Sequence, residues 1–288
     1  MCTLVILRRP RAAGPLLLAA NRDELYSRPS LPPGRYWPDR PHVLAGLDLR
    51  AGGAWLGVND AGVAAGLLNR HGTFQPDPGS RSRGDVVLRA LDHASARGTA
   101  KAFTVLDAAG WRPFNLIVAD ASDAFWLCHR GSSAMVVTAI PPGLHMIEGG
   151  DLDDPASPRL RHYRPRFSAA ATPDPTSGQW QGWQEILADR DGPTGRSEEA
   201  MCLADIAIAG AGLAGTVSSA LLALPGRATT PAVFLHAAGP PDQAAFLPVA
   251  ASADGVKVPA ARAPANERHI GTARHGTAFA LPGEVETC

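Results

Sequence analysis

Cys2 is the residue of this chain whose position most favours chemistry. Because cysteine is small, we expect an aminopeptidase to remove Met1 and to leave Cys2 as the mature N-terminus. Cys2 would then carry a thiol and a free α-amino group, a nucleophile together with its own base. Their ordinary pKa values, about 8.5 for a thiol and about 7.7–8.0 for an α-amine, suit this pairing near neutral pH. The alternative is that Cys2 is a small apolar residue buried in a first strand.

The residues that follow predict a β-hairpin that brings polar side chains to Cys2. Apolar runs at 3–7 and 16–20 flank a segment at 8–15 that contains prolines and a glycine. Two apolar runs around such a turn are typical of a hairpin. The end of its second strand would lie beside the start of its first, so the polar tetrad 21–24 would be a neighbour of Cys2.

The tetrad consists of Asn21, Arg22, Asp23 and Glu24. Four polar residues at the end of a buried strand are costly unless they are paired. A carboxylate of the tetrad would hold an α-ammonium group, and Arg22 would favour a thiolate or a substrate carboxylate. In a regular strand Asn21 and Asp23 share one face, and Arg22 and Glu24 share the other. The alternative is a solvated strand end.

Long and specific motifs fill the first quarter of the chain. They are MCT at 1–3, LAANRDELYSRP at 18–29, WPDRPHVLAGLDL at 37–49 and AGGAWLGV at 51–58. On these motifs the chain resembles the NRDE family, which includes the transport and Golgi organisation protein 2 group. The resemblance makes Asn21, Glu24 and Trp55 candidate binding residues.

The NRDE family is in turn similar to N-terminal nucleophile hydrolases, above all the cysteine branch with bile-salt hydrolases and penicillin V acylases. This likeness implies an α+β fold, a four-layer αββα sandwich with two stacked antiparallel sheets between helical layers. Segment 59–69 is similar to the strand–turn–strand that ends in an oxyanion-hole asparagine there, which makes Asn69 a candidate donor. One such donor stabilises a transition state by about 2.7–4 kcal/mol. A strand-end turn residue is the equal alternative for Asn69.

The chain departs from the family pattern at two places. Glu148-Gly149 stands where relatives carry a Ser-Asn pair, and Val217 stands where they carry an arginine. If that asparagine is a second oxyanion donor, backbone N–H groups of Gly149 or Gly150 would take its role. The departures imply a pocket altered for another ligand, or reduced chemistry.

Composition bounds the remaining possibilities. The chain has 288 residues, and its 45% hydrophobic content suits one domain, expected over 1–260 with a partly disordered tail at 261–288. Lys+Arg and Asp+Glu number 27 each, so nothing indicates nucleic acid or an anionic membrane as a partner.

The four cysteines lie far apart, which argues against a disulfide framework and fits the cytoplasm. No metal-ligand spacing is present, and we expect no metal and no cofactor. The uncharged segment 206–224 is mostly small residues, and we expect no membrane span.

Strand-like and helix-like patterns alternate in blocks, which favours an α+β fold over βαβ units. Strands are predicted at 3–7, 16–21, 54–58, 63–68, 114–119, 124–128, 134–139, 216–222 and 232–235. Helices are predicted at 83–96, 155–167, 179–188 and 198–209.

Two functional classes follow. The first is an amidohydrolase or acyltransferase that acts on a small acylated amide or thioester through a Cys2 thioester, with Arg22, Asp23 and Asn69 as further catalytic residues. The second is a non-catalytic carrier of haem or acyl-CoA, because a Cys2 thiolate would also ligate haem iron.

The four thiols are expected to differ in reactivity. A nearby Arg22 or α-ammonium would lower the pKa of Cys2 below that of a free thiol. Cys128, which ends an apolar run, should be buried and inert. Cys202, in a predicted helix, should also be slow to react. The terminal Cys288 should be exposed and react at an ordinary rate.

Overall fold

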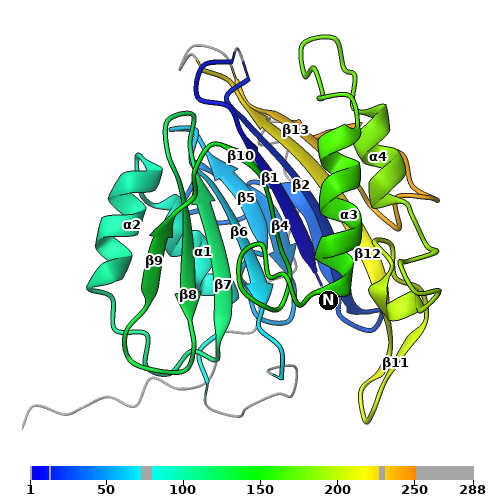
Figure 1. Ribbon diagram of the computed structural model, residues 1–288. Helices are drawn as coiled ribbons and strands as arrows, with labels where there is room; N and C mark the ends of the chain where they lie inside the picture. The colour runs from blue at the N-terminus through cyan, green and yellow to red at the C-terminus, as the bar shows by residue number, and fades with distance from the viewer. Residues whose placement is uncertain (1, 13, 73–79, 227–230, 251–288) are drawn as a thin grey trace, which may run out of the picture. The chain divides into compact units, whose positions relative to one another are not determined.

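Two antiparallel β-sheets lie face to face, with helices on the outer face of each (Figure 1). The computed structural model describes residues 2–12, 14–72, 80–226 and 231–250. Met1, the predicted tail at 261–288 and its Cys288 lie outside the described residues.

The first sheet has the strand order β10-β1-β2-β12-β13-β14, and β11 pairs with β12 beside this path. Every pairing in it is antiparallel, and β1 and β2 form the predicted hairpin with Thr3 opposite Asn21. Its strands are β1 (Thr3–Arg8), β2 (Leu16–Leu25), β10 (Gly143–Ile147), β11 (Ile206–Ile208), β12 (Gly212–Leu224), β13 (Val233–Ala237) and β14 (Leu247–Pro248).

The second sheet is a meander in which each strand pairs with the next along the chain. Its strands are β3 (Ser30–Gly34), β4 (Val43–Asp48), β5 (Leu56–Asn59), β6 (Ala64–Asn69), β7 (Phe114–Ala119), β8 (Ala124–His129) and β9 (Val136–Ala139).

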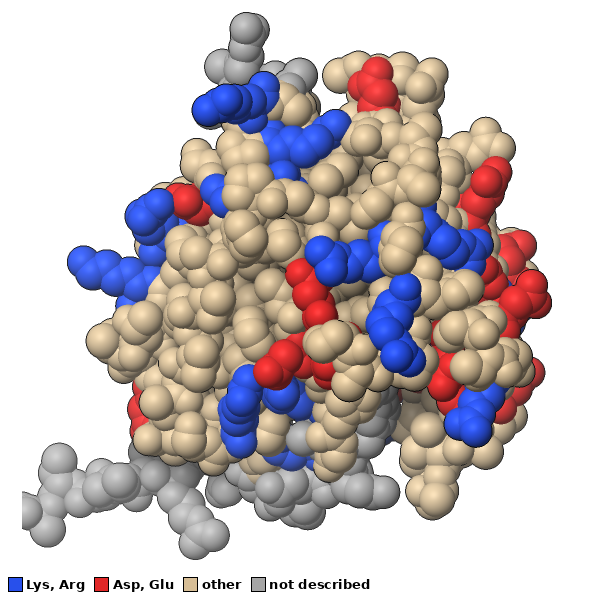
Figure 2. All heavy atoms as spheres, in the orientation of Figure 1, with Lys and Arg blue, Asp and Glu red and all other residues tan. Residues whose placement is uncertain are grey.

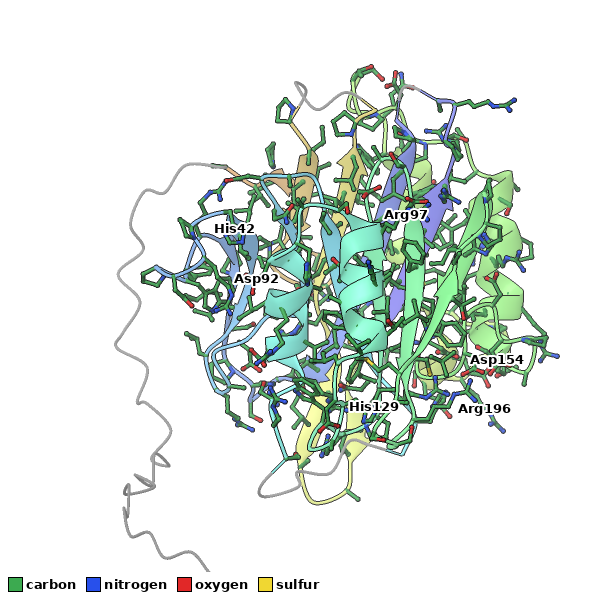
Figure 3. The ribbon with its side chains drawn as sticks, turned by 90° about the vertical axis from the view of Figure 1, so that its left-hand side faces the viewer. His42, Asp92, Arg97, His129, Asp154 and Arg196 are labelled. Carbon is green, nitrogen blue, oxygen red and sulfur yellow. The ribbon has the colours of Figure 1, made fainter. Side chains whose placement is uncertain are left out.

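Helices cover the outer faces of both sheets. Helices α1 (Gly84–Leu91) and α2 (Ala96–Thr104) pack on the second sheet, and Figure 3 shows them from that side. Helices α3 (Pro158–Ala169) and α4 (Gln181–Leu187) pack on the first sheet. A third cluster of buried side chains fills the space between the sheets. These three cores confirm the α+β class and the four-layer αββα arrangement.

Two of the four predicted helices differ from the structure. The helix predicted at 83–96 ends early, at Leu91. Helix α2, which was not predicted, begins at Ala96, where Ser95 caps it by accepting a hydrogen bond from the backbone N–H of Gly98 at 3.0 Å. The helix predicted at 198–209 is wrong. A single 3₁₀ turn, Ser197–Glu199, is followed by β11, whose isoleucines pair with β12.

Surface features agree with the even charge balance. Basic and acidic side chains lie interspersed on the face shown in Figure 2. Among the described helices, none is both long and apolar enough to cross a membrane.

Candidate active site

The β1–β2 hairpin brings Cys2 to the polar tetrad. Thr3 lies opposite Asn21 in the ladder, so Cys2 lies beside the residues that follow Asn21. The Cys2 Sγ donates a hydrogen bond to the backbone carbonyl oxygen of Asp23 at 3.4 Å. A contact across 21 residues of sequence was therefore predictable from the hairpin pattern alone.

Strand alternation divides the tetrad between two faces of the first sheet. The Asn21 amide nitrogen donates to the backbone oxygens of Leu187 and Met201 in the helical layer, at 2.9 Å each. Arg22 points the other way, into the space between the sheets, where its Cζ lies 4.1 Å from the centre of the Trp55 ring. Both amide N–H groups of Asn21 are thus used inside the protein, whereas Arg22 and Trp55 meet across the two sheets.

Asp23 belongs to a buried polar cluster on the helical side of the sheet. Its Oδ1 accepts a hydrogen bond from Thr216 Oγ1 at 2.6 Å. Arg159, which is 3% exposed, lies at the start of α3 with its Nη1 3.3 Å from Glu148 Oε2 and 3.9 Å from Asp23 Oδ2. The same Nη1 donates to Thr3 Oγ1 at 3.1 Å. One guanidinium therefore neutralises two buried carboxylates directly behind Cys2.

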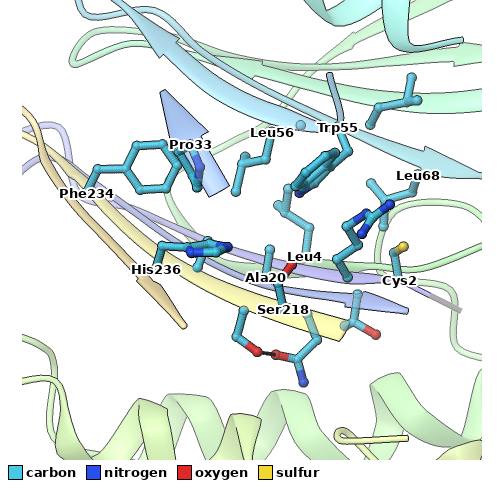
Figure 4. Close-up of a pocket in the computed structure, with 17 residues that line it drawn as sticks. Cys2, Leu4, Ala20, Pro33, Trp55, Leu56, Leu68, Ser218, Phe234 and His236 are labelled. Carbon is cyan, nitrogen blue, oxygen red and sulfur yellow. Dashed lines mark hydrogen bonds between the residues drawn. The ribbon is translucent and has the colours of Figure 1, made fainter. Parts of the chain in front are cut away.

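A pocket between the two sheets begins at Cys2 (Figure 4). It encloses about 440 Å³ of empty space, its open mouth included. Most of its wall is apolar, and the polar side chains among its lining come mainly from the first sheet. The lining residues are Cys2, Thr3, Leu4, Ala20, Asn21, Arg22, Pro33, Trp55, Leu56, Gly66, Leu67, Leu68, Ser218, Ser219, Ala220, Phe234 and His236.

Like Asp23, three further predicted site residues are not in the lining of this pocket. Asn69 ends β6, one residue after the lining residue Leu68, and its side chain makes no hydrogen bond to another described residue. Glu24 Oε1 accepts from the backbone N–H of Leu25 at 3.0 Å. Gly149 is buried in the loop after β10, where its carbonyl oxygen accepts from the backbone N–H of His71 at 3.0 Å.

The loop after β10 is held by the strand ends of the second sheet. The Asn115 amide nitrogen on β7 donates to the backbone oxygens of Glu148 and Gly150, at 3.1 and 2.7 Å. The Glu148 carboxylate turns towards α3 and accepts a hydrogen bond from Ser157 Oγ. The residue that replaces serine of the family pair therefore serves the buried cluster. Val217, the other departure, lies at a bulge in β12.

The expected lowering of the Cys2 pKa is not found in the chain that retains Met1; for the chain without Met1 it stays a prediction. Burial raises the pKa of the Cys2 thiol to about 11, and the Asp23 carboxylate acts in the same direction. The residue as a whole is half-buried, but its sulfur is surrounded by protein. Arg22 is desolvated as well: burial lowers the pKa of its guanidinium and outweighs the attraction to a Cys2 thiolate. Cys2 is thus a protonated thiol at neutral pH.

The other two described thiols are 1% exposed each, which confirms the burial predicted for Cys128. Cys128 lies on β8, where guanidinium groups of Arg70 and Arg130 are 3.3 and 3.4 Å from its sulfur. Cys202 lies in an irregular segment, and burial raises its pKa to about 12.

Two residues of the site were not predicted from the sequence. Arg159 follows Ser157-Pro158 at a helix start, which marks the helix and gives no sign of a partner in β2. His236 lies on β13, a strand that was predicted to end one residue earlier. If the predicted strand had been extended by one residue, His236 would have been placed on the same face as Phe234, because side chains two residues apart share a face.

Residues 1–193 match the sequence model of the family described as Transport and Golgi organisation 2. The chain belongs to this family. The homologue of Mus musculus is 32% identical over 171 residues, which cover 54% of this chain and 59% of that protein. The Homo sapiens homologue is 32% identical over 169 residues, with the same coverage of each chain. The match thus spans about three fifths of the length of these curated relatives.

Solved structures with similar arrangements were also found. One is the Caenorhabditis elegans orthologue of N-acylethanolamine-hydrolyzing acid amidase, with 12% identity and a TM-score of 0.49 over 78% of this chain and 94% of that one. Another is a mutant conjugated bile acid hydrolase from Clostridium perfringens, with 10% identity and a TM-score of 0.47 over 88% of this chain and 98% of that one. Their names describe the activities of those proteins alone.

Proposed function

We propose that this member of the Transport and Golgi organisation 2 family is an N-terminal-nucleophile amidohydrolase or acyltransferase that uses Cys2. The observation that carries the proposal is the position of Cys2 at one end of an apolar inter-sheet pocket, with a buried carboxylate cluster behind it. The substrate class is a small acylated amide or thioester, whose acyl group would lie along the apolar wall.

The raised pKa of Cys2 defines what the mechanism must supply. A thiol with a pKa of about 11 is almost entirely protonated at pH 7, so the site needs a base. Removal of Met1 would create one on the same residue, since a free α-amine has an ordinary pKa of about 7.7–8.0. The Asp23 carboxylate would then hold the protonated amine that results.

The proposed reaction has two steps that balance. The α-amine takes the thiol proton while Cys2 Sγ attacks the acyl carbon, and the bond from that carbon to the leaving amine or thiol breaks as the proton passes to the leaving group. Water or an amine then attacks the Cys2 thioester, which releases the acyl product and returns the proton to Sγ. The Asn69 amide and the Gly149 backbone N–H are the proposed donors to the acyl oxygen.

The alternative of a haem or acyl-CoA carrier is less well supported. A haem ligand would have to be a resting thiolate, and burial together with Asp23 opposes that form. A neutral thiol beside an internal base suits a nucleophile that is deprotonated only during attack.

The test is acylation of the purified protein, followed by intact mass and peptide mapping. We expect loss of Met1 and, with N-acetylcysteamine thioesters as acyl donors, one acyl adduct on the peptide that contains Cys2. Cys2→Ala should abolish the adduct, and Cys202→Ala, which removes a buried thiol of higher pKa, should leave it unchanged. Retention of Met1 in reactive protein, or an adduct that survives Cys2→Ala, would overturn the proposal.

A further inference from the structure

The pocket that begins at Cys2 has a histidine at its opposite end. His236 lines the pocket on β13, and Figure 4 shows it at the opposite end from Cys2, near Phe234 and Pro33. Its Nε2 is buried and has no hydrogen-bond partner among the described residues. A buried polar atom without a partner is costly, so this nitrogen calls for a partner that enters the pocket.

The sheet register shows how far apart Cys2 and His236 lie along the pocket. Leu4 lies opposite Ala20, Ala20 opposite Ala220, and Ala220 opposite His236. Three strand spacings and the two residues from Leu4 to Cys2 place the Cys2 and His236 Cα atoms about 16 Å apart in a flat sheet. A ligand that touches both must therefore be elongated.

The charge state of His236 narrows the chemistry further. Burial lowers its pKa to about 4, and the positive charge of Arg22 lowers it in the same direction. The ring is therefore neutral at physiological pH and offers a hydrogen bond rather than a charge. A carboxylate at this end of the ligand would find no cation in the imidazole, whereas a hydroxyl group would find a neutral partner.

We propose that His236 selects acyl groups that carry an uncharged hydrogen-bonding group, a hydroxyl above all, at the end remote from the reacting carbonyl. This inference rests on the proposed acyl pocket of Cys2 and deepens it. The apolar wall formed by Leu4, Leu56 and Phe234 would hold the chain between the two polar ends. His236 thus acts as a specificity-determining residue that never meets the reacting atoms.

The experiment compares matched acyl donors. N-acetylcysteamine thioesters of hexanoic, octanoic, decanoic and dodecanoic acid are tested beside their ω-hydroxy analogues for kcat/KM with the full chain. At the best-fitting length we expect the hydroxylated donor to be preferred roughly tenfold, the scale of one buried hydrogen bond. His236→Phe should remove the preference while plain donors still react, and His236→Gln should restore part of it. Phe234→Leu, which alters only the apolar wall, should retain it.

A second measurement separates this inference from the proposed function. In Cys2→Ala protein, binding of free octanoic and 8-hydroxyoctanoic acid is measured by titration calorimetry, with and without His236→Phe. Preference for the hydroxy acid that depends on His236 supports the inference even if no donor acylates Cys2, which would refute the enzyme alone. Equal binding of both acids, as expected if bound water alone satisfies Nε2, or a preference that survives His236→Phe, would overturn it.

Discussion

The buried arginine behind the candidate nucleophile gives the sharpest test of the fold. Arg159 is 3% exposed and bonds Thr3 Oγ1 and the backbone oxygen of Glu198, at 3.1 and 2.7 Å. It is also the cation beside the carboxylates of Asp23 and Glu148. Arg159→Met keeps much of the side-chain volume but removes the positive charge. The buried carboxylates of Asp23 and Glu148 then lose this cation.

The expected cost is large because the acids cannot reach water. Removing one partner of a buried ion pair destabilises a protein by about 3–5 kcal/mol. For a domain of this size, that corresponds to a fall in Tm of roughly 6–20 °C. The assay is urea and thermal unfolding under reducing conditions. The matched control is Arg161→Met on the exposed face of the same helix, expected within about 0.5 kcal/mol of the wild type.

The double variant tests the physical reason for the loss. Glu148→Gln removes one of the stranded charges, so Arg159→Met with Glu148→Gln should be more stable than the sum of the single effects predicts, by about 1 kcal/mol or more. A loss below about 1 kcal/mol for Arg159→Met, or strict additivity in the double variant, would refute the account of a charge-neutralising cluster.

Three further outcomes are expected. Because the pKa of Cys2 is about 11, its alkylation by iodoacetamide should accelerate about tenfold per pH unit from pH 7 to 9, and a plateau in that range would contradict the raised value. Burial raises the pKa of Asp153, but the hydrogen bond to His145 and other favourable contacts outweigh it and bring the pKa below 3.8. Stability from this depressed pKa is present above about pH 4 and lost as pH falls through the folded value, so Asp153→Asn should lower unfolding free energy at pH 7 and change little near pH 2. Gly53→Ala should destabilise the fold by roughly 1–3 kcal/mol, because the added Cβ would lie 2.5 Å from the backbone of Gly84. Urea unfolding titrations measure the stability of the Asp153→Asn and Gly53→Ala variants.

Local sequence patterns were enough to predict the hairpin that holds Cys2 and the polar residues beside it. The β1–β2 hairpin, the polar tetrad beside Cys2 and the two-faced split of that tetrad all follow from short-range periodicity. The same periodicity misled at 198–209, where a helix-like apolar spacing gave way to pairing of β11 with β12. The pairing is a local hairpin between residues four to eight positions apart, and its ladder hydrogen bonds override a weak helical preference.

Strand β3 was missed because its sequence argues against a strand. Strand β3 contains Pro32 and Pro33, which are typical of turns and tolerated in a strand only at a sheet edge. β3 is the edge strand of the second sheet, and its pairing with β4 is irregular between Leu31 and Gly34. Only the assembled sheet shows that these prolines need no hydrogen-bond partner on the outer side.

The polar cluster could not be derived from the sequence for a different reason. Arg159 and Asp23 are 136 residues apart in the chain, and they approach only when α3 packs on the first sheet. The fold imposes the partnership, so a charge in a helix carries no sign of it. His236 was missed in the same way, because its role depends on a pocket whose lining comes from seven strands of the two sheets.

The tetrad explains how one strand serves both halves of the proposed site. The outward residues Asn21 and Asp23 bind the helical layer and Thr216, and thereby fix β2 against its neighbours. The inward residue Arg22 faces the pocket and stacks on Trp55 from the opposite sheet. Because side chains alternate with a period of two, a slip of one residue would exchange these sets, burying Arg22 among the helices and placing the carboxylate in the pocket. The position of Cys2 beside Asp23 therefore depends on the same register that turns Arg22 towards the pocket.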